Sequence, residues 1–187
     1  KTRIGIDDRD DYGFLRDFVG TVAAKGCDTF IIHARKAFLK GLSPAENRTV
    51  PPLKWDVAYR LKQDFPQLCI VLNGGIKTVE DIQTALTQLD GVMIGREAYQ
   101  NPYMLAAVER AVFGAQETPS RAAIIERLIP YIERSLAEGV GLKDITRHIL
   151  GLYHGRPHAR KWRQVLSAPG DNDSLAPLRA ALAVAEQ

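Results

Sequence analysis

Short apolar runs alternate with longer amphipathic stretches along the first two thirds of the chain. The apolar runs predict strands at residues 3–6, 29–33, 69–72 and 91–94, each four or five residues long and rich in Ile and Val. Their apolar positions are continuous rather than alternating, which is typical of strands buried on both faces. The pattern therefore predicts four short, buried strands.

Apolar residues at helical spacing predict a helix after each strand. The first helix is expected over residues 11–25 and the second over residues 55–65. Thr78 and Asp81 have the spacing of a capping box, which opens the third helix. Strand followed by helix, repeated in this way, predicts right-handed βαβ units and a parallel sheet.

Loops follow the predicted strands at residues 7–10, 35–52, 73–77 and 96–101. In parallel α/β folds the chemistry lies at the carboxyl ends of the strands. We therefore expect the functional side chains in these four loops.

The pattern after Gly114 is helical, without any strand. Asn101-Pro102 is typical of a cap with proline at the first helical position, and Gly114 ends that helix. Thr118-Pro119 starts another helix, and further helices are expected over residues 142–152, 157–166 and 175–185. We predict an α/β domain over residues 1–116 and a small all-helical domain over residues 117–187.

Composition changes this picture little. The 187 residues are 45% apolar and 25% charged, which excludes a fibrous or largely disordered chain. A net charge of +3 is too small to establish a nucleic-acid partner. Two cysteines form no disulfide framework, and no apolar run approaches the about 20 residues that span a bilayer. We expect a cytoplasmic protein without a membrane segment or a metal site.

Glycine stands directly after two of the predicted strands. Asn73-Gly74-Gly75-Ile76 follows one, and Gly95-Arg96 follows the next. Glycine lets a ligand approach the backbone and leaves N–H groups free for phosphate oxygens, and Arg96 adds a planar cation for the same phosphate. Two consecutive loops of this kind hold phosphate in many (β/α)8 barrels. The alternative is that these glycines only make tight turns.

His33 ends its strand, where its ring can donate to a ligand, or can be a core histidine that finds its partner inside the protein. Lys1 and Arg3 share one face of the first strand, and a buried lysine there needs an anionic or polar partner. Cys27 and Cys69 lie near the amino-terminal ends of their strands. We expect both thiols to pack as small apolar groups rather than to react.

The helical tail carries an uneven charge distribution. Residues 145–170 contain no acidic residue, but hold five lysines and arginines together with Tyr153 and Trp162. One helical turn brings together Arg160, Lys161, Arg163 and Gln164, with Trp162 facing elsewhere. A basic face beside aromatic residues suits a phosphate backbone. It equally suits a solvated face balanced by acidic residues elsewhere.

Several motifs together resemble the tRNA-dihydrouridine synthases, and most closely the bacterial A subfamily, which modifies the D-loop. The resemblance extends over essentially the whole chain. It is carried by His33-Ala34-Arg35-Lys36, Gly41-Leu42-Ser43-Pro44 with Asn47-Arg48, Pro51-Pro52-Leu53, Asn73-Gly74-Gly75-Ile76, the segment from Gly91 to Tyr99, and Gly155-Arg156-Pro157 with Ala159-Arg160 and Trp162-Arg163.

This resemblance implies an FMN-dependent (β/α)8 TIM barrel followed by a helical domain that docks tRNA. In the family, NADPH reduces the flavin, the flavin passes hydride to C6 of a flipped-out uridine, and a cysteine protonates C5. Carried over by motif, the flavin-binding residues are Lys1, His33, Asn73, Gly74, Gly75, Gly95 and Arg96. The tRNA-binding residues are Arg35, Arg48, Lys161 and Gln164, with Arg160 and Arg163 as neighbours.

The resemblance covers only the carboxyl-terminal half of such a barrel. The family's catalytic cysteine belongs to the other half, so we expect no catalytic residue in this chain and no reduction of uridine by it alone. We expect a fragment whose exposed sheet edges favour self-association. Two alternatives stay open: a flavin barrel acting on a small molecule, such as a relative of dihydroorotate dehydrogenase, and a non-catalytic RNA-binding fragment.

Overall fold

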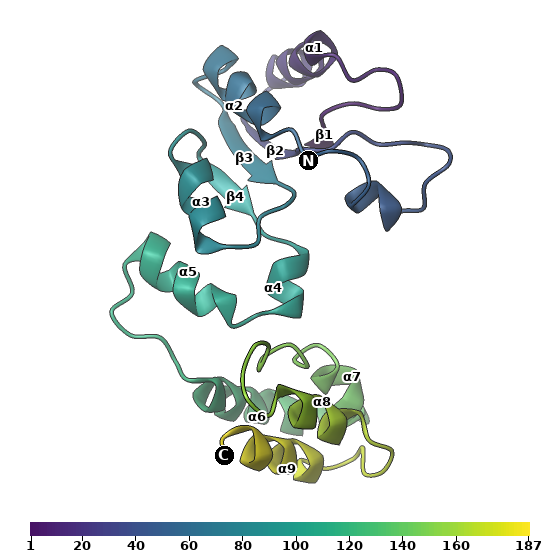
Figure 1. Cartoon of the computed structure of the whole chain (residues 1–187), viewed down its shortest axis with the longest axis vertical. Coiled ribbons are helices and arrows are strands. Elements are labelled where there is room, and N and C mark those ends of the chain that lie inside the picture. Colours follow the sequence, from purple (N-terminus) through teal and green to yellow (C-terminus); the bar gives the residue numbers. More distant parts are fainter. The chain divides into compact units, whose positions relative to one another are not determined.

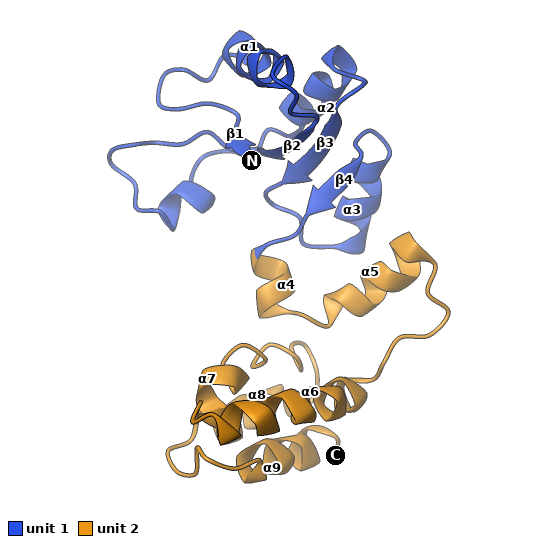
Figure 2. Cartoon of the chain, turned by 180° about the vertical axis from the view of Figure 1, so that it is seen from behind, with its two compact units in different colours: residues 1–95 blue, residues 96–187 orange.

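The computed structural model describes residues 1–187 and divides them into two compact units, Lys1–Gly95 and Arg96–Gln187 (Figure 2). The first unit contains the sheet, and the second contains only helices. The domain boundary predicted between residues 116 and 117 stays a prediction, and the two compact units meet at a different place, between Gly95 and Arg96.

The first unit holds a four-stranded parallel sheet (Figure 1). Its strands are β1 (Thr2–Arg3), β2 (Thr29–His33), β3 (Cys69–Asn73) and β4 (Gly91–Met93). Their order in the sheet is their order in the chain, so no strand reverses the direction of winding. This order is that of a barrel rather than of a doubly wound sheet. The predicted α/β class and the predicted parallel strands are confirmed.

Three helices of the first unit connect these strands. They are α1 (Tyr12–Ala23), α2 (Trp55–Asp64) and α3 (Val79–Leu86). The predicted capping box is confirmed, since the Thr78 hydroxyl accepts from the Asp81 N–H at 3.1 Å and the Asp81 carboxylate accepts from the Thr78 N–H at 3.0 Å. A short 3-10 helix, η1 (Glu46–Arg48), interrupts the long loop after β2.

The prediction that the strands are buried on both faces is wrong for one face. Phe30, Ile32, Ile70 and Leu72 are buried, whereas alternate positions such as Ile31 and Val71 are only half-buried. Right-handed crossovers between strands laid down in chain order place every helix on the same side of the sheet. This chain therefore covers one face with its own helices and leaves the other more open.

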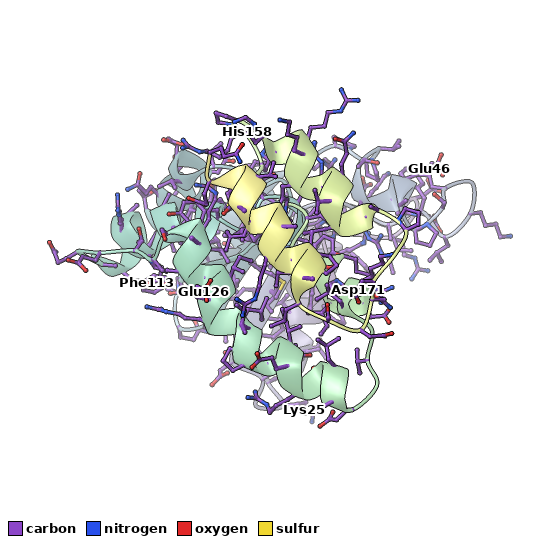
Figure 3. All side chains as sticks on the ribbon, turned by 90° about the horizontal axis from the view of Figure 1, so that it is seen from below. Lys25, Glu46, Phe113, Glu126, His158 and Asp171 are labelled. Atoms are coloured by element: carbon purple, nitrogen blue, oxygen red, sulfur yellow. The ribbon has the colours of Figure 1, made fainter.

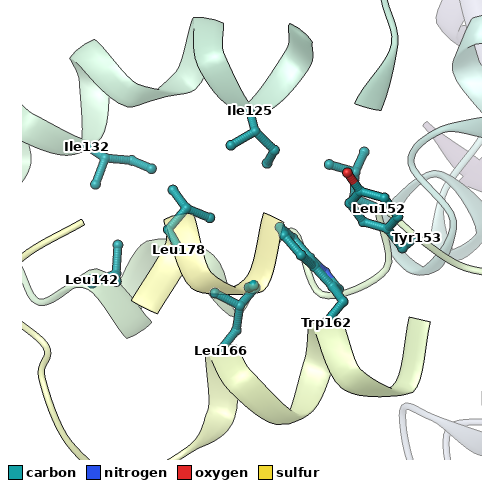
Figure 4. Packing of buried hydrophobic residues seen from close by; sticks show 9 residues of the cluster. Ile125, Ile132, Leu142, Leu152, Tyr153, Trp162, Leu166 and Leu178 are labelled. Carbon is teal, nitrogen blue, oxygen red and sulfur yellow. The ribbon is translucent and has the colours of Figure 1, made fainter. Parts of the chain in front are cut away.

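The second unit contains only helices, and its main apolar cluster is shown in Figure 4. The helices that contribute to this cluster are α6 (Arg121–Ala137), α7 (Leu142–Thr146), α8 (Ala159–Ser167) and α9 (Ala176–Ala185). The other two helices, α4 (Arg96–Gln100) and α5 (Met104–Phe113), contribute no residue to it. Trp162 from α8 and Leu178 from α9 are fully buried among Ile125 and Ile132 of α6. The predicted all-helical tail is confirmed.

Three predicted details of this unit are wrong. Residues 96–101, predicted as a loop, contain α4, and α5 begins at Met104 rather than at Pro102. The helix predicted over residues 142–152 ends at Thr146. The chain then turns so that Gly151 lies against Gln100, whose carbonyl oxygen would be 2.1 Å from a Cβ at Gly151. Gly114 ends α5 in the left-handed region, as predicted.

Candidate functional site

The carboxyl ends of the strands bring four side chains into one row. The register pairs Arg3 with His33, His33 with Asn73, and Asn73 with Met93. Residues paired across parallel strands project from the same face of the sheet. Lys1 lies two positions before Arg3 and shares this face, and its Nζ is 3.2 Å from the Met93 Sδ. The predicted residues Lys1, His33 and Asn73 therefore lie together.

The glycine pair after β3 is packed tightly against this row. Gly74 and Gly75 have φ values of +108° and +79°, which favour glycine. A Cβ on Gly74 would lie 2.7 Å from the His33 ring, and a Cβ on Gly75 would lie 2.3 Å from Leu53. Trp55 Nε1 donates to the Gly74 carbonyl at 2.9 Å. Neighbouring side chains therefore hold the glycine turn in one shape.

Leu53 and Trp55 were not predicted as site residues. Leu53 belongs to the Pro51-Pro52-Leu53 motif, to which the sequence alone assigns no role. The structure shows that the motif ends the long loop against the glycine turn. The signal available in the sequence was an apolar residue followed shortly by an indole donor, directly after two prolines.

Gly95 is glycine for a different reason. It follows β4 in an exposed position, its φ is not left-handed, and nothing lies within 4 Å of a Cβ placed on it. Open space beside an exposed backbone fits the approach of an anion such as a phosphate. Arg96 follows directly in the chain and begins α4 of the second unit.

The loop after β2 carries two of the predicted nucleic-acid residues. Arg35 is half-buried, and its guanidinium donates to the Pro51 carbonyl. Arg48 is exposed at the end of η1. Asp10, in the loop that follows β1, forms ion pairs with two lysines of the loop after β2. Its Oδ2 lies 3.1 Å from the Lys36 Nζ and 3.7 Å from the Lys54 Nζ. The hydrogen bond from Lys36 lowers the pKa of the Asp10 carboxyl.

Helix α8 presents the other predicted nucleic-acid residues. Trp162 and Leu166 are buried, and the Trp162 indole donates to the Ile149 carbonyl at 3.3 Å. The opposite side exposes Arg160, Lys161, Arg163 and Gln164. No ion pair involves these cations. Figure 3 shows His158 just before the start of this helix, where its φ is +61°.

Neither cysteine lies at the carboxyl ends of the strands. Cys69 begins β3, and Cys27 precedes β2 by two residues, so both are at the opposite end of the sheet from His33 and Asn73. Both thiols are half-buried. None of the helices combines the length and the apolar composition that a membrane-spanning segment needs.

Each unit thus holds part of the predicted set. The first unit contains Lys1, His33, Arg35, Arg48, Asn73, Gly74, Gly75 and Gly95. The second contains Arg96, Arg160, Lys161, Arg163 and Gln164.

Comparison with known proteins identifies the family. The model of the dihydrouridine synthase family matches residues 1–185 of this chain. The chain belongs to the dihydrouridine synthase family. This family is flavin-dependent, and its fold is a TIM barrel. The four strands in chain order are in keeping with such a barrel.

Curated relatives agree with this assignment. Proteins named tRNA-dihydrouridine(20/20a) synthase are 57% identical over 169 residues in Escherichia coli, 58% over 168 residues in Shewanella oneidensis and 56% over 170 residues in Vibrio cholerae. Each match covers 89% of this chain, but only 51%, 50% and 52% of the respective relative. The chain spans about half the length of the curated relatives that it matches.

Proposed function

We propose that this chain is the part of a tRNA-dihydrouridine synthase that holds the flavin phosphate and docks tRNA. The complete enzyme would reduce uridine to dihydrouridine in the tRNA D-loop with FMN and NADPH. The observation that carries the proposal is the row of Lys1, His33 and Asn73 beside the constrained Gly74–Gly75 turn, in a chain of this family.

The residues present fit the flavin nucleotide. The backbone at Gly74, Gly75 and Gly95, with the Arg96 guanidinium, would hold the phosphate, and Asn73 would contact the ribityl chain. Lys1 and His33 would donate hydrogen bonds to the flavin ring, because both project from the sheet face that carries the row. Bound FMN would supply hydride transfer to C6 of uridine, with NADPH as the reductant.

The basic residues suit the RNA substrate. We assign the phosphate backbone of tRNA to the exposed face of α8, because its cations form no ion pair and attract phosphates from a distance. Arg35 and Arg48, in the loop after β2, are proposed as further contacts because they belong to the motifs of that loop. Positions 20 and 20a, which the names of the relatives print, are the proposed uridines. A cytoplasmic location and self-association through the sheet edges stay predictions. We assign no catalytic residue to this chain, in keeping with where Cys27 and Cys69 lie.

The experiment is a salt titration of tRNA binding by the parent chain and by the double variant Arg160→Ala/Arg163→Ala. Removing two phosphate contacts should weaken binding and reduce the slope of log K against log salt by about 1.4–1.8. The matched control is Arg127→Ala/Arg134→Ala, which removes the same charge from exposed positions of α6. Each of these arginines directly follows a glutamate, Glu126 (Figure 3) or Glu133. Removing the two arginines should therefore change the slope much less.

A slope that is the same in both double variants would contradict the assignment of α8 to tRNA. It would favour a flavin barrel that acts on a small molecule, because such an enzyme has no use for the basic face of α8.

A further inference from the structure

The long loop between β2 and α2 is folded around one buried amide side chain, that of Asn47. Its Oδ1 accepts from the Phe38 N–H at 2.8 Å, and its Nδ2 donates to the Phe38 carbonyl at 2.9 Å. The amide thereby pairs with both the N–H and the C=O of one residue, as a residue of a neighbouring strand would. Nδ2 also lies 3.3 Å from the Leu42 carbonyl and 3.4 Å from the Ser43 carbonyl. Asn47 therefore closes the loop from residue 38 to residue 47.

Arg3 fastens this closed loop to the sheet. Its NH1 donates to the Lys36 carbonyl at 2.9 Å and to the Asn47 carbonyl at 2.8 Å, one at each end of the segment that Asn47 closes. Arg3 lies at the carboxyl end of β1, paired with His33. A single guanidinium thus fixes the loop relative to the strand ends, where the candidate site lies.

Arg48 follows Asn47 directly and is exposed. The turn that carries it is closed a second time, because the Ser43 N–H donates to the Glu46 carboxylate at 2.8 Å and the Glu46 N–H donates to the Ser43 hydroxyl at 3.2 Å. Burial and the nearby Arg48 cation lower the pKa of the Arg3 guanidinium. Two cations held near each other make this part of the loop attractive to a phosphate.

We propose that Asn47 is a positioning residue that holds Arg48 ready to contact a phosphate of the RNA substrate. The inference rests on the proposed function, since it takes tRNA as the ligand. Asn47 itself is not placed to contact RNA, because its side chain is buried and both polar atoms of its amide already bond inside the loop. Its effect on binding would pass through Arg48, because a loop that is ordered before binding loses less conformational entropy in the complex.

The test is a double-mutant cycle on tRNA binding with Asn47→Ala, Arg48→Ala and the two combined. The control is Thr78→Ala, which removes the cap of α3 in the same unit, also without a change of charge. Each variant is measured at several salt concentrations, with its thermal unfolding recorded. Arg3→Lys is the second variant. It keeps the charge but loses the guanidinium that donates to both carbonyls, so it loosens the same loop. It tests the proposal if Asn47→Ala does not fold.

We expect Arg48→Ala to reduce the salt slope by about 0.7–0.9, so that its penalty shrinks about threefold between 50 and 200 mM salt. Asn47→Ala should reproduce this slope change although it removes no charge, and it should weaken binding less than twofold further when Arg48 is already alanine. Arg3→Lys should act as Asn47→Ala does. Thr78→Ala should lower the unfolding temperature without changing the slope.

An equal loss from Asn47→Ala with and without Arg48 would overturn the proposal, because Asn47 would then act on stability alone. Binding that is unchanged in Asn47→Ala or in Arg48→Ala would also overturn it. If the α8 variants still weaken tRNA binding, either of these two results would reject the role of Asn47 and leave the proposed function standing. If the parent chain does not bind tRNA, the proposed function fails together with this inference.

Discussion

At the scale of single residues, Gly75 and Gly95 belong to the same proposed phosphate site and are glycines for opposite reasons. Gly75 has a φ of +79°, and Leu53 would lie 2.3 Å from its Cβ, so its fold requires glycine. Gly95 has neither a left-handed φ nor a neighbour within 4 Å of its Cβ. The fold itself therefore does not require glycine at position 95, and only a bound ligand could.

Alanine at these two positions separates folding from binding. Gly75→Ala should cost about 1–2 kcal/mol for the left-handed backbone, with a further cost for moving Leu53. Each kcal/mol corresponds to about 2–4 °C in the unfolding temperature of a chain of this size. Gly95→Ala should unfold at the parent temperature and bind FMN more weakly, because its methyl group occupies the space assigned to the phosphate.

Thermal unfolding and FMN titration of both variants check this expectation. Gly95→Ala with full FMN affinity would remove Gly95 from the phosphate site. Gly75→Ala with an unchanged unfolding temperature would show that Leu53 does not constrain the glycine turn.

The residues proposed to contact ligand are marked in the sequence more clearly than the residues that hold them in place. Gly74, Gly75 and Gly95 stand directly after strands, so their place follows from the strand pattern. Leu53, Trp55 and Asn47 act through contacts across the loop of residues 35–52. The path of such a loop depends on tertiary hydrogen bonds, which no local periodicity encodes.

At the scale of elements, α8 combines a packed side with the basic side that we propose binds tRNA. Trp162 and Leu166 point into the cluster of the second unit, and the Trp162 ring centroid lies 4.8 Å from that of Tyr153. The cations occupy the remaining positions of the same nine-residue helix. The buried indole therefore determines which way the basic face points.

Trp162→Ala should be strongly destabilising for this reason. Removing a fully buried tryptophan costs about 3–5 kcal/mol through lost burial and the cavity left behind. Arg163→Ala on the same helix should change stability by no more than about 0.5 kcal/mol, since its side chain is exposed. Denaturant unfolding of both variants measures the difference. Equal stabilities would contradict the packing of α8 on this cluster.

Strands with a dense apolar run were predictable, whereas a very short helix and the end of a longer one were not. Residues 29–33 were predicted as a strand and form β2 (Thr29–His33), because a run of apolar and β-branched residues determines it. Helix α4 has five residues, too few to show a period, so it was predicted as a loop. The helix predicted over residues 142–152 has the right apolar spacing, but Gly151 packs on Gln100 instead of continuing it.

At the scale of the whole molecule, the sheet and the family match give one account. Four parallel strands in chain order, with helices on one face, are the pattern of a barrel wall. The chain covers about half of its relatives, and its sheet has one face that its own helices leave open. The continuous apolar strands predicted burial on both faces. In a complete barrel both faces of a strand are buried, one by helices and one by the barrel interior, so both carry apolar residues.

In the proposed function, the two units mainly bind different ligands: the first binds the flavin ring and the second binds tRNA. The first unit holds the row of Lys1, His33 and Asn73 and the glycine turn, and the second holds α8. The sequence could indicate both proposed parts because each carries a dense motif. It could not predict that the first compact unit ends at Gly95.

The most direct test of the central claim compares FMN with riboflavin, which lacks the phosphate. The visible absorption spectrum of the purified chain is titrated with each flavin, and the titration is repeated with Arg96→Ala. Hydrogen bonds to charged groups contribute about 1.5–3 kcal/mol, so FMN should bind at least about tenfold more tightly than riboflavin. Arg96→Ala should remove most of this preference. Equal binding of the two flavins by the parent chain would contradict the claim that these glycine loops and Arg96 hold the flavin phosphate.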